Sequence, residues 1–145
     1  MTRHDDPRVQ RVIDFFETLT PDSVQHFGRY YTDDCHFKDP FNEVQGLAEV
    51  QRIFRHMDVA LREPRFVVTA AVAQGDQCFL TWDFLFRFRR YSDAPQVVRG
   101  ASHLLFAPDG RIAVHRDYWD AAEELYEKLP VVRLLMRWLK RRANT

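Results

Sequence analysis

The chain has 145 residues, and 46% of them are hydrophobic, which fits one globular domain with an ordinary buried core. The chain has 21 lysine and arginine residues and 21 aspartate and glutamate residues. Six of the basic residues lie from Lys128 onward, where no acidic residue occurs, so residues 1–127 carry a net charge of −6. Because the body is acidic and shows no nucleic-acid-binding motif, we expect no nucleic acid as partner.

Cysteine usage and hydropathy exclude further classes of protein. Cys35 and Cys78 show neither a CxxC spacing nor a histidine at zinc-ligand spacing, so we expect no disulfide framework, no metal and no other cofactor. The sequence contains no apolar run of roughly 18 residues, and its N-terminus lacks the apolar core of a signal peptide. We therefore expect a cytoplasmic protein.

The N-terminal residues predict two helices. Asp5-Asp6-Pro7 is typical of a helix start, and apolar residues recur at helical spacing from Val9 to Leu19. Thr20-Pro21-Asp22 repeats the start signal, and the apolar positions that follow predict a short second helix extending to Tyr31. The two helices are expected to form a hairpin.

A short strand and a third helix are predicted next. Apolar and polar residues alternate from Cys35 to Asp39, and Pro40 ends the pattern, which indicates a strand with Cys35, Phe37 and Asp39 on one side. Gly46 opens an apolar stripe at helical spacing that predicts a helix ending at Pro64.

From Arg65 the apolar residues recur at every second position. This period predicts long strands over 65–73, 78–90, 96–107 and 111–120, separated by turn residues. We expect an antiparallel meander that curves strongly, with the three helices before it closing a cone around an aromatic interior. The predicted fold class is α+β, in a single domain over 1–145.

Polar groups interrupt one face of the last predicted strand. Alternation places His115, Asp117 and Trp119 on the same face. A strand packed on a uniform core would not need a histidine and an aspartate beside a tryptophan, which favours a cavity with a few polar groups in an apolar wall. The alternative is a pair of hydrogen-bonded wall residues without chemistry.

Three motifs resemble parts of the nuclear transport factor 2-like superfamily, particularly its SnoaL-like and ketosteroid-isomerase-like branch. Tyr31-Thr-Asp-Asp-Cys-His-Phe-Lys-Asp-Pro40 resembles the segment that carries the catalytic base of ketosteroid isomerases, which implies that role for Asp39. His103-Leu-Leu-Phe-Ala-Pro-Asp-Gly110 resembles the last hairpin of the superfamily. Arg116-Asp-Tyr-Trp-Asp120 is similar to the final strand of limonene-epoxide hydrolases, which implies Asp117 as the water-activating aspartate. The resemblance covers nearly the whole chain.

The sequence also departs from both kinds of enzyme. Ketosteroid isomerases hold the enolate with a tyrosine and a protonated aspartate, whereas Phe15 and Ser102 stand at those positions here. Epoxide hydrolases of this fold use an Arg-x-Asp pair together with a tyrosine and an asparagine. The corresponding residues in this chain are Trp82 and Phe84 for the pair, and Phe37 and Asp39 for the other two.

Two functions of different classes are compatible with these residues. The first is a cofactor-independent isomerase, cyclase or hydrolase that acts on an apolar small molecule through the catalytic candidates Asp39, Asp117, His115 and His103. For either histidine the alternative role, which the sequence favours, is that of a hydrogen-bonded wall residue, and for Asp39 the alternative is a turn residue. The second is a binding or interaction module without chemistry. In both, the resemblance implies a substrate pocket lined by Phe15, Phe16, Phe37, Trp82, Phe84, Ser102 and Trp119.

The sequence also predicts an oligomeric state and a helix at the C-terminal end. The outward faces of the long strands carry apolar residues, so we expect a homodimer formed by paired sheets. Residues 131–142 predict a basic amphipathic helix. It would pack across the mouth or flank of the cone, form a dimer contact or bind an anionic membrane surface, and we expect the last of these least.

Overall fold

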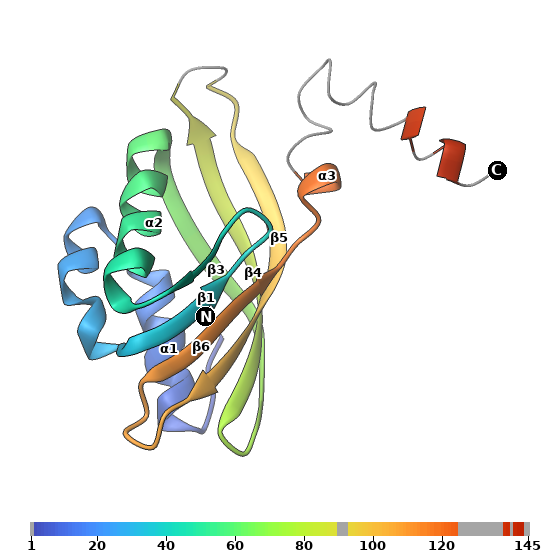
Figure 1. Ribbon diagram of the computed structural model, residues 1–145. Helices are drawn as coiled ribbons and strands as arrows, with labels where there is room; N and C mark the ends of the chain where they lie inside the picture. The colour runs from blue at the N-terminus through green and yellow to red at the C-terminus, as the bar shows by residue number, and fades with distance from the viewer. Residues whose placement is uncertain (1, 90–92, 125–137, 140, 144–145) are drawn as a thin grey trace.

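The computed structural model describes residues 2–89, 93–124, 138–139 and 141–143. Its main helices precede most of the sheet in the chain (Figure 1). They are α1 (Pro7–Glu17), the 3₁₀ helix η1 (Pro21–Arg29) and α2 (Leu47–Ala60), and a short helix α3 (Ala121–Glu124) follows the last strand. The predicted C-terminal helix over 131–142 lies largely outside the described residues.

Within the described residues, six strands form one mixed sheet in the order β2-β1-β6-β5-β4-β3. The strands are β1 (Tyr31–Lys38), β2 (Glu43–Gln45), β3 (Leu61–Gln74), β4 (Gln77–Phe88), β5 (Gln96–Phe106) and β6 (Ile112–Tyr118). The β3–β6 meander is antiparallel, which confirms the predicted α+β class. β1 pairs with β6 in parallel, and neither this pairing nor strand β2 was predicted.

The helix starts follow their predicted caps. The carboxylate of Asp6 accepts a hydrogen bond of 2.9 Å from the backbone N–H of Arg8, and Pro7 occupies the first turn of α1, where no N–H is needed. The prediction that the second helix reaches Tyr31 is wrong. η1 ends at Arg29, because Tyr31 pairs with Ile112 and begins β1, four residues before the predicted strand.

The boundary between α2 and β3 also differs from the prediction. α2 ends at Ala60, and β3 runs from Leu61 through Pro64. A proline is tolerated there because β3 is an edge strand, and the pairing with β4 shifts register between Arg62 and Arg65. Glu63, inside this irregularity, adopts a positive φ of 52°.

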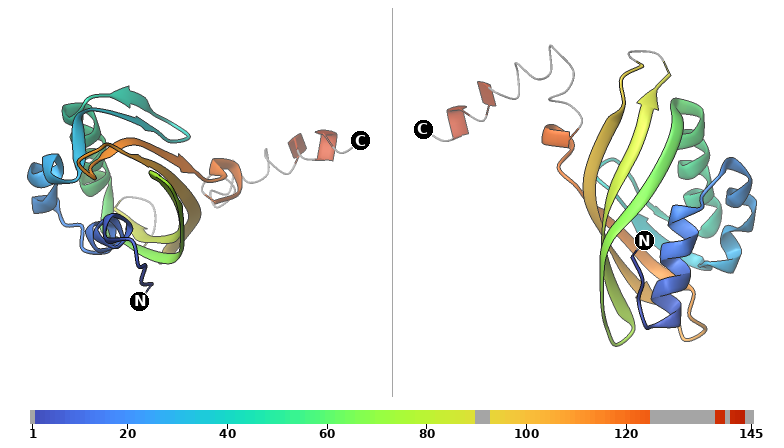
Figure 2. Two further views of the ribbon diagram at one scale, coloured as in Figure 1. Left: turned by 90° about the horizontal axis from the view of Figure 1, so that it is seen from below. Right: turned by 180° about the vertical axis from the view of Figure 1, so that it is seen from behind.

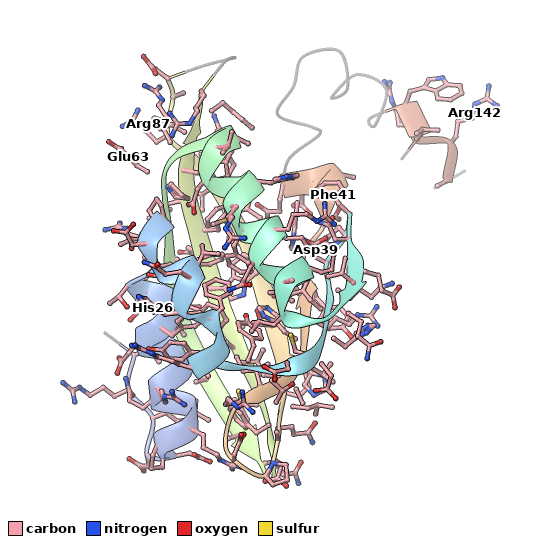
Figure 3. All side chains as sticks on the ribbon, turned by 60° about the vertical axis from the view of Figure 1, so that its left-hand side comes forward. His26, Asp39, Phe41, Glu63, Arg87 and Arg142 are labelled. Atoms are coloured by element: carbon pink, nitrogen blue, oxygen red, sulfur yellow. The ribbon has the colours of Figure 1, made fainter. Side chains whose placement is uncertain are left out.

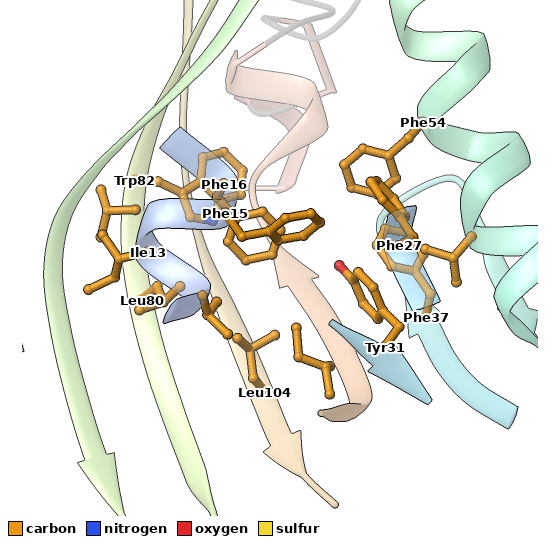
Figure 4. Packing of buried hydrophobic residues seen from close by; sticks show 14 of the residues in the cluster. Ile13, Phe15, Phe16, Phe27, Tyr31, Phe37, Phe54, Leu80, Trp82 and Leu104 are labelled. Carbon is orange, nitrogen blue, oxygen red and sulfur yellow. The ribbon is translucent and has the colours of Figure 1, made fainter. Parts of the chain in front are cut away.

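The curved sheet turns its concave side towards α1, η1 and α2 (Figure 2). Buried aromatic and aliphatic side chains fill the space between the two layers. Tyr31 lies among them with no exposed surface and directs its hydroxyl towards Phe15 and Phe16 (Figure 4). A buried hydroxyl needs a hydrogen-bond partner, and the partner of this hydroxyl is one of a few polar residues in the interior. No described helix is long and apolar enough to cross a lipid bilayer.

Candidate functional site

A cavity of about 370 Å³ lies between α2 and the concave face of the sheet. Its walls are mainly aromatic, with side chains from β1, α2, β3, β4 and the segments that follow β1 and β6: Phe37, Phe41, Phe54, Phe66, Trp82, Phe84, Phe86, Phe88 and Trp119. Four polar side chains also line it: Asp39, Asn42, His56 and Asp117. This composition, apolar with a few polar groups, is that of a small-molecule pocket.

Asp117 is the acceptor at the centre of a buried hydrogen-bond network. Its Oδ1 accepts a hydrogen bond of 2.5 Å from the Ser102 hydroxyl and lies 2.6 Å from Nε2 of His115. The Ser102 hydroxyl in turn accepts one of 2.9 Å from the indole N–H of Trp82, and Nδ1 of His115 lies 2.7 Å from the Tyr31 hydroxyl. Five side chains from β1, β4, β5 and β6 are thus connected.

The direction of these hydrogen bonds follows from Asp117. A carboxylate can only accept, so Nε2 of His115 carries the hydrogen and donates to Oδ1. In a neutral imidazole Nδ1 is then the acceptor, and the Tyr31 hydroxyl donates to it. Complete burial, and after it the negative charge of Asp117, raises the pKa of Tyr31 well above its ordinary value, which keeps this donor protonated. Both chains of donors end on the same carboxylate oxygen.

The other oxygen of Asp117 is placed differently. Oδ2 accepts no hydrogen bond from the described residues, although its side chain is only 14% exposed. Asp117 lines both the large cavity and an adjoining one of about 10 Å³, whose polar walls also include Ser102 and His115. The smaller cavity approaches the size required for one water molecule. Asp117 thus offers one anchored and one uncommitted oxygen.

Asp39 lines the same large cavity, but its carboxylate is engaged in a turn. Oδ1 accepts hydrogen bonds from the backbone N–H groups of Phe41 and Asn42, at 2.8 and 2.7 Å, and both oxygens contact the Asn42 side-chain amide. Asp39 and Phe41 lie next to one another beyond the end of β1 (Figure 3). Asp39 therefore follows β1 rather than belonging to it and closes a turn, the alternative role that its place before Pro40 suggested, while its side chain still borders the cavity.

The pocket predicted from the sequence is distributed over three places. Phe37, Trp82, Phe84 and Trp119 line the large cavity, and Phe16 and Ser102 line the small one together with Trp82. Phe15 lines neither. It packs in the core, with its ring stacked 4.0 Å from that of Tyr30, because its position on α1 faces η1 rather than the sheet.

The two candidate histidines lie on opposite faces of the sheet. His115 is 2% exposed and belongs to the network, whereas His103 lies on the outer face, where its ring stacks on Phe79 and hydrogen-bonds Gln77. Alternation along β5 causes this, because Ser102 and Leu104 point inwards and leave His103 between them pointing outwards. His103 is therefore not a residue of the cavity, and the expectation that it acts there is corrected.

Comparison with known protein families identifies the family of this chain. Residues 12–115 match the family model of the SnoaL-like domain. The chain belongs to this family. The matched segment includes Tyr31, Asp39, Ser102 and His115, and it ends two residues before Asp117. None of the curated proteins compared with the sequence matches it.

Solved structures share the fold of this SnoaL-like domain at low sequence identity. A candidate polyketide cyclase from Acidithiobacillus ferrooxidans is 15% identical, with a TM-score of 0.73 over 90% of this chain and 99% of its own. A ketosteroid-isomerase-like protein from Catenulispora acidiphila, solved in complex with trimethylamine, is 15% identical, with a TM-score of 0.71 over 84% and 92%. An LEH-like epoxide hydrolase from M. tuberculosis is 14% identical, with a TM-score of 0.63 over 81% and 83%. These confirm the nuclear transport factor 2-like fold.

Sequence reasoning missed Tyr31 and the loop residues Phe41 and Asn42. Tyr31 occupies an apolar position of a helical pattern, and nothing local signals the distant parallel strand that brings it to His115. The Asp39-Pro40-Phe41-Asn42 turn could have been found from its composition, since aspartate, proline and asparagine are typical turn residues. Among the described residues, no group of three or more histidine, cysteine or acidic side chains could hold a metal ion.

Proposed function

We propose that this SnoaL-like domain is a cofactor-independent enzyme that binds an apolar small molecule in the large cavity and uses Asp117 as general base for an isomerisation, cyclisation or hydrolysis. The observation that carries the proposal is the asymmetry of the Asp117 carboxylate. Oδ1 accepts from Ser102 and His115, while Oδ2 has no donor among the described residues and its side chain borders an apolar cavity. That the Catenulispora relative was solved with trimethylamine supports a small-molecule ligand.

Each member of the network has a separate part in the proposed chemistry. Oδ2 of Asp117 takes a proton from a carbon acid or a water molecule. Ser102 and His115 fix the carboxylate in one orientation, which reduces the cost of reorganisation during proton transfer. The aromatic walls exclude water that would compete for Oδ2. Asp39 holds the turn that presents Phe41 and Asn42 to the cavity, and its part in the proposed function is structural.

The base-promoted ring opening of 5-nitrobenzisoxazole tests this function without knowledge of the natural substrate. A base removes the C–H proton of the isoxazole ring, the N–O bond breaks, and a coloured cyanophenolate forms. The wild-type protein should accelerate the reaction, and Asp117→Asn should lower kcat/KM by about two orders of magnitude, the usual contribution of a general base. Asp83→Asn, on the β4 face away from the cavity, is the matched control and should behave as wild type.

A ligand-binding module without catalysis is the alternative, and one observation favours it. The Asp39 carboxylate is used by its own turn, so Asp117 is the one carboxylate of the described cavity with an uncommitted oxygen. A binding module would show no ring opening above that of free acetate at equal concentration. Asp117→Asn would then change ligand affinity alone, and this result would overturn the enzymatic proposal.

A further inference from the structure

We infer that the ligand of the large cavity is an organic cation, a tertiary or quaternary ammonium group on an apolar body, held between aromatic side chains and the Asp117 carboxylate. This inference rests on the part of the proposed function that makes the cavity the ligand site. It does not require that Asp117 catalyse a reaction. The charge of the walls, the hydrogen bonds of the carboxylates and the nature of the apolar surface support it.

The described walls of the cavity are negatively charged. Asp39 and Asp117 contribute two carboxylates, whereas no lysine or arginine among the described residues lines the space. Lys38 and Arg116 neighbour these aspartates in the chain and line a separate, more open hollow of about 600 Å³ with them, but neither lines this cavity. Lys38 forms an ion pair of 3.0 Å with Glu43, and the guanidinium of Arg116 lies 4.6 Å from the centre of the Tyr118 ring. His56, on the exposed surface of α2, is the one other titratable residue that lines the cavity in the described part of the chain.

The carboxylates of both aspartates accept hydrogen bonds from donors of the protein. Asp117 accepts from Ser102 and His115 on one oxygen, and Asp39 accepts from Phe41 and Asn42. A neutral hydrocarbon that filled the cavity would cover Oδ2 of Asp117 without offering a donor or a positive charge. An ammonium group would compensate the carboxylate charge while its methyl groups contact the apolar wall, so the cavity favours the cation over an uncharged ligand of equal shape.

The aromatic side chains add a second attraction for positive charge. The rings of Phe66 and Phe84 are stacked at 4.5 Å, and Trp119 meets Phe41 edge to face at 5.5 Å beside the two aspartates. The negative face of an aromatic ring attracts a cation within about 6 Å, most strongly for tryptophan. A cavity that combines such rings with carboxylates matches the recognition of alkylammonium groups.

A pair of probes that differ in charge but not in shape tests the inference. Benzyltrimethylammonium and neopentylbenzene present the same branched end, with nitrogen or carbon at its centre. Tryptophan fluorescence, reported by Trp82 and Trp119, gives the affinity of each for the full chain. We expect the cation to bind at least about ten-fold more tightly, which combines the cation–π attraction with the ionic attraction to Asp117. Equal or tighter binding of neopentylbenzene, or binding of neither probe, overturns the inference.

Variants separate this inference from the proposed catalysis. Asp117→Asn should reduce the preference for the cation by about five-fold or more, whereas Asp83→Asn should leave it unchanged. Should Asp117→Asn fail to fold, Trp119→Leu provides the test, because it should weaken the cation more than the hydrocarbon. If the ratio of the affinities for the cation and the hydrocarbon is the same in all these variants, the inference that the ligand is an organic cation is overturned. Cation binding without ring opening would refute catalysis alone, and ring opening without a cation preference would refute the ligand class alone.

Discussion

Nε2 of His115 lies 2.6 Å from Oδ1 of Asp117, two positions further along the same strand. Side chains at alternate positions of a strand point to the same face, so the backbone of β6 brings the two groups into contact without help from a loop. Ser102 approaches the same carboxylate from the neighbouring strand, directly opposite Asp117 in the register. Because rigid strands supply every member of the network, the orientation of the carboxylate is set before a ligand binds.

Removal of the Tyr31 hydroxyl should weaken the fold through His115. Tyr31→Phe leaves Nδ1 of a fully buried imidazole without its donor, and an unsatisfied buried group costs about 1–3 kcal/mol. The free energy of unfolding in urea measures this loss. Tyr30→Phe, next along the chain, is the control. It keeps the stacking on Phe15 and should change stability by less than about 0.5 kcal/mol.

The two aspartates of the cavity should respond differently to substitution. Asp39→Asn keeps an acceptor for the N–H groups of Phe41 and Asn42, so we expect ring opening to fall by less than about three-fold, against about a hundred-fold for Asp117→Asn. Asp39→Ala should lower the free energy of unfolding by about 1 kcal/mol through loss of the turn. A hundred-fold loss in a folded Asp39→Asn protein would instead show that both carboxylates transfer protons.

Alkaline pH should destabilise the protein through its two buried thiols. Burial raises the pKa of Cys35 from 9.0 to about 11 and that of Cys78 to about 12. The unfolded chain loses these protons first, so the stabilising contribution is complete below pH 9 and disappears as the pH rises from 9 through the folded-state values. Each thiol adds a slope of up to about 1.4 kcal/mol per pH unit in this window.

Unfolding measured at several pH values between 8 and 12 tests the slope. Cys78→Ala should remove its part of the pH dependence, whatever constant loss the smaller side chain causes. A slope identical to that of wild type would mean that this thiol does not contribute.

Position 100 has room only for a glycine, because Trp82 lies directly opposite Gly100 in the register of β4 and β5 and its indole occupies the adjacent space. A Cβ at position 100 would approach Cζ2 of Trp82 to 2.7 Å, so Gly100→Ala must displace the ring and strain its hydrogen bond to Ser102. We expect a loss of about 1–3 kcal/mol in the free energy of unfolding, as for other overpacked cores. Gly28→Ala, whose Cβ would lie 3.4 Å from Leu47, is the control.

The outer face of the sheet is expected to form a homodimer. Val72 and Phe79 face each other across β3 and β4 and remain 65% and 47% exposed, with Leu105 and Tyr118 exposed on the strands beyond. Light scattering at tens of micromolar protein should give twice the monomer mass of 17.3 kDa. Phe79→Lys should shift this mass towards that of the monomer. A monomeric wild-type protein would contradict the expectation.

Local patterns were sufficient to predict the meander and to sort the residues of each strand into two faces. Alternation identified His115, Asp117 and Trp119 as neighbours on one face. The structure places His115 and Asp117 on the inner face of β6, and Trp119, just beyond the end of the strand, lines the same cavity as Asp117. Alternation alone does not say which face of a two-sided sheet is covered, so it could not decide which of His103 and His115 faces the cavity. The covered face depends on where the helices pack, which is a property of the whole chain.

Long-range pairing was beyond the reach of sequence patterns. The parallel contact between β1 and β6 joins residues about 80 positions apart, and it alone brings Tyr31 to His115. The end of α2 was misplaced for a related reason. Pro64 signals a helix stop in isolation, but an edge strand with an irregular register accommodates it.

The parallel pairing of β1 with β6 also determines when the cavity can exist during folding. Tyr31 is synthesised early, but His115 and Asp117 lie 84 and 86 residues later, so the network cannot close until nearly the whole sheet has been made. Contacts of such sequence separation slow folding, because a long loop must be closed before they form. Until then, the aromatic face of β4 and the unpaired edge of β1 remain exposed on a nascent chain that is prone to aggregate. Truncation before residue 112 should therefore give an insoluble product rather than a smaller folded domain.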